Sequence, residues 1–279
     1  MTNKQDIITL WASSWIPRDD VFLMIQSVMS ISSKDIFLLD DIDEKYIPEI
    51  QEMFQKRKSW IPLEYILWEA EFYGYRFFVT SDTLIPRNDT EVLVEKAIEY
   101  IKSQNNNVSL VDIWTGTGCI PISILKEIWD KIDKSYAIDI SPLALSIAEK
   151  NKHAHELSQS IELLGWDLFI PLQDIQFKDL VATANLPYIL DDDFENIDDS
   201  VAEHEPHRAL FGWKQTGFEL YEKLIGQLQS ISADSIILFI EIGFDQWQIV
   251  RDFCKTKDIS FQIYKDNGWI ERCVEIKIR

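Results

Sequence analysis

Glycine and cysteine are both scarce in this chain. It has 9 glycines among 279 residues, whereas the usual share of about 7% would give roughly twenty. Tryptophan, in contrast, occurs 10 times. The three cysteines, Cys119, Cys254 and Cys273, are scattered with no CxxC spacing. This pattern implies neither a disulfide framework nor a zinc site, so we expect no metal.

Positive charge is low and long apolar runs are missing. Lys and Arg number 27 against 47 Asp and Glu, which gives a net charge of −20. Such a charge repels phosphate backbones, so nonspecific nucleic-acid binding is disfavoured, and a basic protein or a small cationic ligand is easier to accommodate. No run approaches the roughly 18 apolar residues of a membrane span, and residues 1–10 lack the apolar region of a secretory signal. We therefore expect a cytoplasmic protein without membrane association.

The first third of the chain reads as helices followed by a hairpin. Short amphipathic or capped stretches lie at 6–14, 19–32, 33–39, 42–58 and 62–69. Aromatic and polar residues alternate over 71–83, which indicates a hairpin, and a helix follows at 90–104 with Asp89 or Thr90 as its cap. We assign residues 1–75 to a small helical domain and residues 76–107 to the hairpin and a linker helix.

From residue 108 onward, strand and helix patterns alternate. Strands are predicted at 108–113, 135–139, 160–163, 179–184, 235–242, 259–265 and 271–278, and helices at 118–130, 142–155, 216–231 and 245–256. This alternation predicts βαβ units, and therefore an α/β domain over 108–279 with a largely parallel sheet of seven strands. The segment 266–270 is too short for a parallel crossover, so the last two strands form an antiparallel hairpin.

A glycine-containing loop follows the first of these strands. Asp112 precedes Trp114, Thr115, Gly116, Thr117 and Gly118, and a helix begins there. Glycines let the backbone turn tightly and approach a ligand, and a helix start offers free N–H groups. A dinucleotide site or a plain structural turn would fit the same loop.

Acidic residues stand at the ends of the next two strands. Asp139, followed by Ile140, can accept both hydroxyls of a ribose, although a helix cap is the alternative. Asp167, followed by Leu168, can take an adenine amino group while apolar atoms cover the ring, and an ordinary loop Asp is as good a reading. Because these strand ends share one edge of the sheet, their agreement is more informative than any single residue.

The stretch Asn185-Leu186-Pro187-Tyr188 ends the apolar run of the fourth strand. Pro187 stops the strand, so carbonyls that would enter a ladder point into the crevice where open α/β sheets bind ligands. The Asn185 amide and the flat Tyr188 ring can together hold a planar amide or amino group. A strand-to-loop turn with an Asn cap is the alternative.

These motifs resemble those of class I S-adenosylmethionine-dependent methyltransferases. The flanking segments, from about residue 5 to the end, are similar to the HemK/PrmC family, which methylates the glutamine of bacterial peptide-release factors. They are Pro62–Leu67, Glu71–Gly74, Leu84–Glu91 and Ala209–Gly212.

The resemblance implies a Rossmann-like methyltransferase sheet, S-adenosylmethionine as cofactor, release factors as partners and a monomer. It gives residues 1–75 the role of substrate recognition. The catalytic residues would be Asn185, Pro187 and Tyr188, and Leu186, Arg87 and Glu91 would join them in binding the glutamine of the GGQ motif. The cofactor would contact Asn185 and the strand-end residues, which are Asp112, Trp114, Thr115, Gly116, Thr117, Gly118, Asp139, Ile140, Asp167 and Leu168.

Leu186 departs from the family, which usually has Asn-Pro-Pro-Tyr. Asn-Leu-Pro-Tyr is typical of ribosomal-RNA adenine dimethyltransferases, so an adenine methyltransferase acting on RNA or DNA stays open. A noncatalytic interaction protein with this fold is a third possibility. The charge of −20 and the N-terminal helical domain favour the protein substrate.

Tryptophan stands where the family has glycine. This holds for Trp60, Trp68, Trp114, Trp213 and Trp247, and by position also for Trp15, Trp166 and Trp269. An indole clashes where the backbone needs a glycine's φ. Some bacteria read UGA as glycine, and glycine at all ten tryptophan positions would restore the usual share of about 7%. A genuine sequence with a degraded cofactor loop is the rival explanation.

Overall fold

The computed structural model describes residues 15–39, 41–190, 203–210 and 216–278. The helix expected at 6–14 and Trp213 lie outside the described residues. The chain divides into two compact units, one of residues 1–69 with 198–204 and one of residues 70–197 with 205–279. The division falls after Glu69, which opens the first strand of the hairpin.

The smaller unit is helical, as predicted. It contains α2 (Arg18–Met29), α3 (Ser33–Leu38), η1 (Glu44–Tyr46), α4 (Ile47–Lys58) and α5 (Leu63–Leu67). Met24, Ile50 and Phe54 form the centre of its core. Ser32 begins α3 with a capping box, in which its side chain and that of Asp35 satisfy each other's backbone N–H groups.

The larger unit is built on a seven-stranded sheet of order β5-β4-β3-β6-β7-β9-β8. Its strands are β3 (Val108–Ile113), β4 (Ile132–Asp139), β5 (Glu162–Gly165), β6 (Phe177–Ala184), β7 (Ala233–Glu241), β8 (Ser260–Lys265) and β9 (Glu271–Ile278). A separate hairpin, β1 (Glu69–Phe72) and β2 (Tyr75–Phe78), precedes it. Within the seven-stranded sheet, the pairings of β9 are antiparallel and the other pairings are parallel, so the predicted α/β sheet with a closing hairpin is confirmed.

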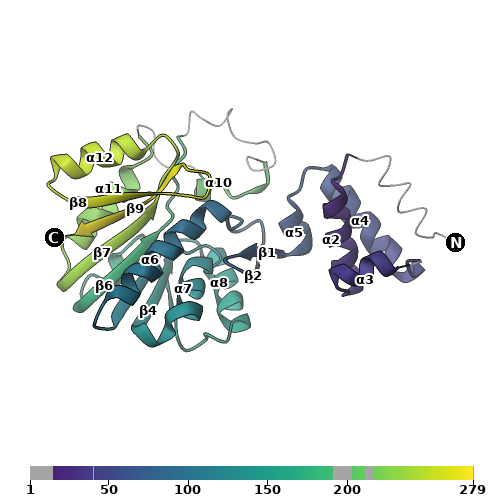
Figure 1. The fold of residues 1–279 in the computed structure, drawn as a ribbon, viewed down its shortest axis with the longest axis horizontal. Coiled ribbons are helices and arrows are strands. Elements are labelled where there is room, and N and C mark those ends of the chain that lie inside the picture. The colour runs from purple at the N-terminus through teal and green to yellow at the C-terminus, as the bar shows by residue number, and fades with distance from the viewer. Residues whose placement is uncertain (1–14, 40, 191–202, 211–215, 279) are drawn as a thin grey trace. The chain divides into compact units, whose positions relative to one another are not determined.

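Helices cover both faces of this sheet (Figure 1). They are α6 (Glu91–Ser103), α7 (Cys119–Ile128), α8 (Pro142–Ala154), α11 (Glu219–Leu228) and α12 (Trp247–Thr256). The shorter elements are α10 (His207–Leu210), η2 (Asn88–Thr90), η3 (Trp129–Lys131) and η4 (Ile170–Leu172). Alternate residues of β3 face opposite sides: Leu110 packs with α6 and α7, whereas Val111 packs in the cluster that includes α11 and α12. In the described part of the chain, no helix has the length and apolarity to cross a bilayer.

The parallel strands end at a common edge. Ile113 lies beside Ile138 of β4 and Ala184 of β6, and Ala184 lies beside Ile240 of β7. The loops that follow these strands therefore meet, as the sequence predicted for the carboxyl ends of a parallel sheet.

Candidate active site

A pocket of about 250 Å³ opens at this edge of the sheet. Its walls come from the segment 81–90, the loop 114–120, the start of α8, Asn185 and residues 206–209. Ligand pockets typically measure ~300–1,000 Å³, so this pocket is slightly small. Trp114 is part of its lining and also packs against the core cluster that includes Val111.

The loop after β3 brings backbone N–H groups to the pocket. Gly118 precedes α7 with φ +79, and a Cβ there would lie 3.3 Å from Ile122 and 3.4 Å from Ala148, so the position favours glycine. Gly116 has φ +54, and a Cβ on it would meet nothing within 4 Å. Trp114 lies between the end of β3 and these two glycines. Its φ is +67, and this backbone conformation strains a bulky residue.

Asp139 lies at the end of β4 and is only 3% exposed. One carboxylate oxygen accepts the Gly116 N–H at 2.9 Å, and the other accepts the Ser141 N–H at 2.8 Å. Burial raises the pKa of this carboxyl, and these backbone hydrogen bonds oppose the rise. The cap of α8 is Ser141, whose hydroxyl accepts from Ala144, so Asp139 is not the helix cap. Ile140, 38% exposed, follows outside the pocket lining.

The pocket fits a nucleoside by its donors and acceptors. Asp139 lines it, and each carboxylate oxygen has a second lone pair beyond the backbone bond that it accepts. The open space above Gly116 lets a ligand approach the backbone closely. Thr115 and Thr117 also line the pocket, as expected from the sequence.

Five predicted cofactor residues lie outside the pocket lining, namely Asp112, Gly118, Ile140, Asp167 and Leu168. Asp112 is fully buried, accepts a 2.6 Å hydrogen bond from Thr183, and burial raises the pKa of its carboxyl to about 7. Asp167 forms an ion pair with Lys223, and Leu168 is buried in the core. Their contact with a cofactor remains a prediction.

The stretch 185–188 has one side chain in the pocket. Asn185 lines it and donates from Nδ2 to Thr90 Oγ1 at 3.3 Å. The Leu186 side chain is buried in the core, and its N–H donates to the Tyr221 hydroxyl at 2.9 Å. Pro187 is also buried. Leu186 and Pro187 can therefore reach a ligand through backbone atoms and not through Leu186's side chain.

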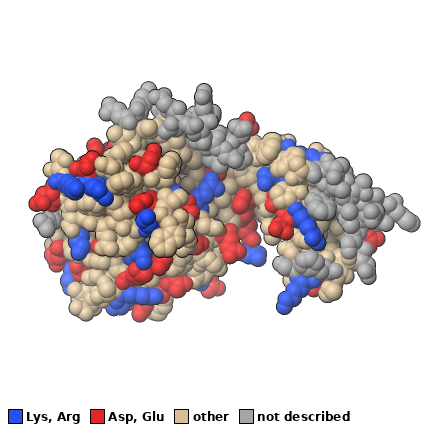
Figure 2. All heavy atoms as spheres, turned by 45° about the horizontal axis from the view of Figure 1, so that its top comes forward, with Lys and Arg blue, Asp and Glu red and all other residues tan. Residues whose placement is uncertain are grey.

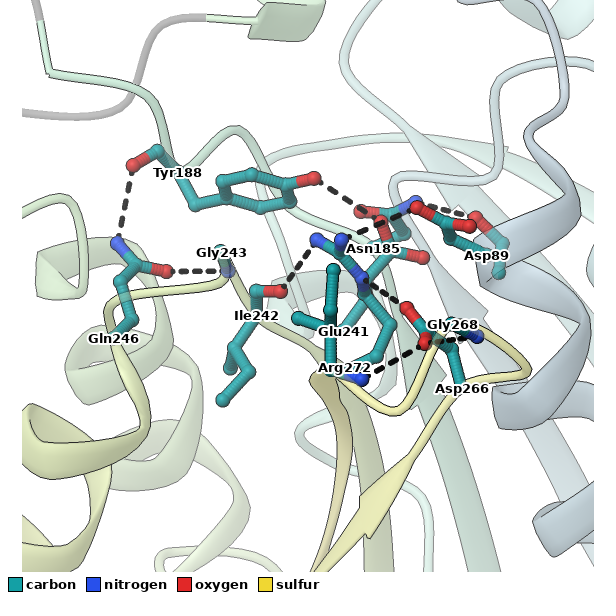
Figure 3. A network of polar contacts seen from close by, with 12 residues as sticks. Asp89, Asn185, Tyr188, Glu241, Ile242, Gly243, Gln246, Asp266, Gly268 and Arg272 are labelled. Atoms are coloured by element: carbon teal, nitrogen blue, oxygen red, sulfur yellow. Dashed lines mark hydrogen bonds and ion pairs between the residues drawn. The ribbon is translucent and has the colours of Figure 1, made fainter.

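Tyr188 is fixed at both ends (Figure 3). Its hydroxyl donates to Glu241 at 3.2 Å, and its backbone carbonyl accepts from Gln246 Nε2 at 3.1 Å. Gln246 in turn accepts the Gly243 N–H at 3.0 Å. Burial and the nearby charge of Glu241 raise the pKa of the Tyr188 phenol, which keeps it protonated at neutral pH.

The two predicted substrate residues of the segment 84–91 are both engaged. Arg87 lines the pocket and forms an ion pair with Glu205, which is 3% exposed. Glu91 accepts the Tyr73 N–H at 2.7 Å and so holds the hairpin to α6. The predicted capping of α6 is wrong: Thr90 occupies the cap position, but its side chain makes no capping bond, and Asp89 pairs with Arg272. Asp89 and Thr90 thus contact β9 and Asn185.

Four residues of this site were missed from the sequence: Thr90, Glu241, Gln246 and Arg272. Glu241 ends the apolar strand β7 at the same edge as Asp139 and Asn185, so the rule that found those two applies to it as well. Arg272 donates to Asp89, Asp266 and the Ile242 carbonyl. No local pattern marks it, because Asp89 and Ile242 are 183 and 30 residues away in the chain.

Comparisons with known proteins place the chain in a family. No family model matches it. A "Release factor glutamine methyltransferase" of Dictyoglomus turgidum is 32% identical over 95% of this chain and 91% of the relative. One of Clostridium acetobutylicum is 31% identical over 92% of each. The solved hMettl16 catalytic domain shares the fold, with a TM-score of 0.54, 12% identity and coverage of 85% and 83%. The chain belongs to the release factor glutamine methyltransferase family.

Proposed function

We propose that the protein transfers a methyl group from S-adenosylmethionine to the side-chain amide nitrogen of the GGQ glutamine in peptide chain release factors. The observation that carries this proposal is the position of Asn185, which shares one pocket with Asp139 and the loop 114–117. An amide-binding group and a hydroxyl-binding group therefore lie close enough to serve one transfer reaction. Membership of the release factor glutamine methyltransferase family supports the choice of substrate.

The cofactor half of the pocket would use Asp139 and the loop after β3. Asp139 would accept ribose hydroxyls, and the open backbone at Gly116 would allow close approach of the amino-acid end. S-adenosylmethionine, when bound, supplies a methyl group made electrophilic by its sulfonium. The protein's residues bind and orient the reactants around it.

The substrate half would use Asn185 and the turn behind it. The Asn185 side-chain oxygen accepts one N–H of the glutamine amide, and the backbone carbonyl of Leu186 or Pro187 accepts the other. With the amide nitrogen held in this way, S-adenosylmethionine would supply the methyl group and leave as S-adenosylhomocysteine, and the methylated nitrogen would lose its proton to solvent. An amide nitrogen is a poor nucleophile, so the site contributes through orientation.

The same geometry could also hold the amino group of an adenine. The sequence Asn-Leu-Pro-Tyr, with Leu186 in second place, is typical of ribosomal-RNA adenine dimethyltransferases. Acidic and basic side chains are interspersed on the face in Figure 2, and the net charge is −20. This charge disfavours a phosphate backbone and supports the protein substrate. We further propose that the protein acts as a cytoplasmic monomer, and that the helical unit, residues 1–69, recognises the factor.

A competition experiment tests the assignment. The protein is incubated with a labelled methyl donor, a release factor and ribosomal RNA together, and label in each is counted. We expect label in the release factor, and Asn185→Ala to abolish it while cofactor affinity changes by no more than a few fold. Label in RNA alone would replace the proposal by the adenine reading, and full activity of Asn185→Ala would remove Asn185 from the chemistry.

A further inference from the structure

We infer that Thr90 and Glu241 are positioning residues that fix the orientation of the Asn185 side-chain amide. The inference rests on the proposed function, because it concerns which end of that amide faces the substrate. Asn185 must present its oxygen to an amide or amino N–H. If the side chain turned over, its NH2 group would face the substrate's NH2 group and the two would repel.

Thr90 selects the orientation through its single hydroxyl proton. Its Oγ1 lies 3.3 Å from Asn185 Nδ2, and the residue is 3% exposed, so water does not compete freely. A hydroxyl can accept from Asn185 only with a lone pair that faces it. The hydroxyl proton must then point elsewhere, and an acceptor is needed to hold it there.

Glu241 is that acceptor. It is 2% exposed at the end of β7, and burial raises the pKa of its carboxyl while the charge of Arg272 opposes the rise. Its Oε2 is buried and has no hydrogen-bond partner among the described residues, so this oxygen is free to accept the Thr90 proton. Tyr188 donates to Oε1 at 3.2 Å. A carboxylate in its ionised form only accepts hydrogen bonds, so the proposed contact is one in which the Thr90 hydroxyl donates to Oε2.

The resulting chain has one direction. The Asn185 NH2 donates to the Thr90 hydroxyl, and this hydroxyl donates to the Glu241 carboxylate. Asn185 therefore leaves its side-chain oxygen for the pocket. Arg272, held by Asp89 at 3.1 Å and Asp266 at 3.3 Å, supplies the positive charge that favours the ionised carboxylate (Figure 3).

Substitutions that keep the size of the Thr90 or Glu241 side chain but change which group donates the hydrogen bond test this inference. Thr90→Val removes the hydroxyl at nearly constant volume, Thr90→Ser keeps it, and Glu241→Gln introduces a group that can donate to Thr90. Thr256→Val is the control, since its hydroxyl bonds within α12 at the surface. We expect kcat to fall roughly 10–100-fold in Thr90→Val and Glu241→Gln, with cofactor Kd within about twofold of the parent. Thr90→Ser should keep kcat within roughly threefold.

The outcomes separate this inference from the proposed function. If the parent protein labels no release factor, the proposed function fails, and the Asn185 side-chain 15N NMR signal still tests the orientation. That signal should show faster proton exchange in Thr90→Val than in the parent. Parent activity together with unchanged kcat in Thr90→Val would overturn the positioning role. Equal losses in Thr90→Ser and Thr90→Val would also overturn it, because the hydroxyl would then not be the cause.

A separate observation concerns the tryptophans, and here we propose that the natural protein has glycine at positions 60, 68, 114 and 269. The backbone at these four has φ of +63, +60, +67 and +63. Only nine described non-glycine residues have positive φ, so tryptophan supplies nearly half of them. For a bulky residue this conformation is a genuine outlier, and random placement of tryptophan does not account for four cases.

The surroundings of these positions are those of glycine. Trp60 follows the end of α4, and Trp68 ends α5 in the left-handed conformation that glycine usually provides. Trp269 lies in the turn between β8 and β9, where its N–H donates to the Asp266 carbonyl at 3.0 Å. Trp60, Trp68 and Trp269 are exposed, Trp269 by 81%, whereas Trp114 is half-buried against the core cluster. Trp114 lines the pocket, and glycine there would relieve the strain of the positive φ next to it.

Mass spectrometry of the protein from its own cells decides between the two residues. Peptides that cover positions 60, 68, 114 and 269 should have the mass of glycine at each, and the gene should have UGA at these codons. Tryptophan masses at these positions, or UGG codons, would overturn the proposal. Neither result depends on activity, so the test is independent of the proposed function.

Discussion

Replacing Trp269 and Trp129 by glycine should change stability in opposite directions. Both side chains are largely exposed, at 81% and 71%, so little buried area is lost in either variant. They differ in backbone conformation, since Trp269 has φ +63 and Trp129 has φ −53. A left-handed conformation costs a non-glycine residue roughly 1–2 kcal/mol, whereas glycine adds about 0.4–1 kcal/mol of unfolded-chain entropy.

The expected effect follows from these two terms. Trp269→Gly should raise the free energy of unfolding by roughly 0.5–1 kcal/mol, because relief of strain exceeds the added entropy. Trp129→Gly should lower it by about 1 kcal/mol, because a helical φ gains nothing from glycine. Urea titration of both variants and the parent gives the difference, which should be about 2 kcal/mol. Equal destabilisation by both substitutions would refute the strain argument at Trp269.

Further substitutions test the site. Asp139→Ala should weaken S-adenosylmethionine binding by roughly 1–3 kcal/mol, measured by calorimetry, and unchanged affinity would exclude a ribose contact. Gln246→Leu leaves the Tyr188 carbonyl without its donor, so kcat should fall about tenfold or more at constant cofactor Kd; a parent-like kcat would show that this clamp is dispensable. Asp112 has a folded pKa of about 7 against 3.8 as its usual value, so the native state holds a proton that the unfolded chain releases between these pH values. The free energy of unfolding should therefore decrease by up to about 4 kcal/mol as pH rises through this interval and level off above it, and Asp112→Asn should abolish that slope in chemical unfolding curves.

Most of the fold could be predicted because its signals are local. Apolar runs of strand length predicted all seven strands. Only five residues separate the last two strands, which is too few for a parallel crossover, so an antiparallel hairpin was predicted there. The edge of the sheet that binds ligands followed from the parallel order alone. Asp139 and Asn185 were found in this way, and both line the pocket.

The rest of the site depends on contacts between distant segments. Arg272 and Asp89 are 183 residues apart in the chain, and Thr90 and Asn185 are 95 apart. Thr90 was expected to cap α6 because hydroxyls at helix starts usually do so, but its hydroxyl faces Asn185. The Thr90 hydroxyl therefore makes a tertiary hydrogen bond with Asn185 in place of the expected capping bond within α6. No sequence pattern predicts which of these two bonds forms.

The most direct test of the central claim is to locate the methyl group on the substrate. A release factor is incubated with the protein and S-adenosylmethionine, digested, and its peptides are fragmented in a mass spectrometer, alongside a factor whose GGQ glutamine is replaced by glutamate. The account predicts one added methyl on the side-chain amide of that glutamine and none in the replaced factor. Methylation at another residue, or equal methylation of both factors, would contradict it.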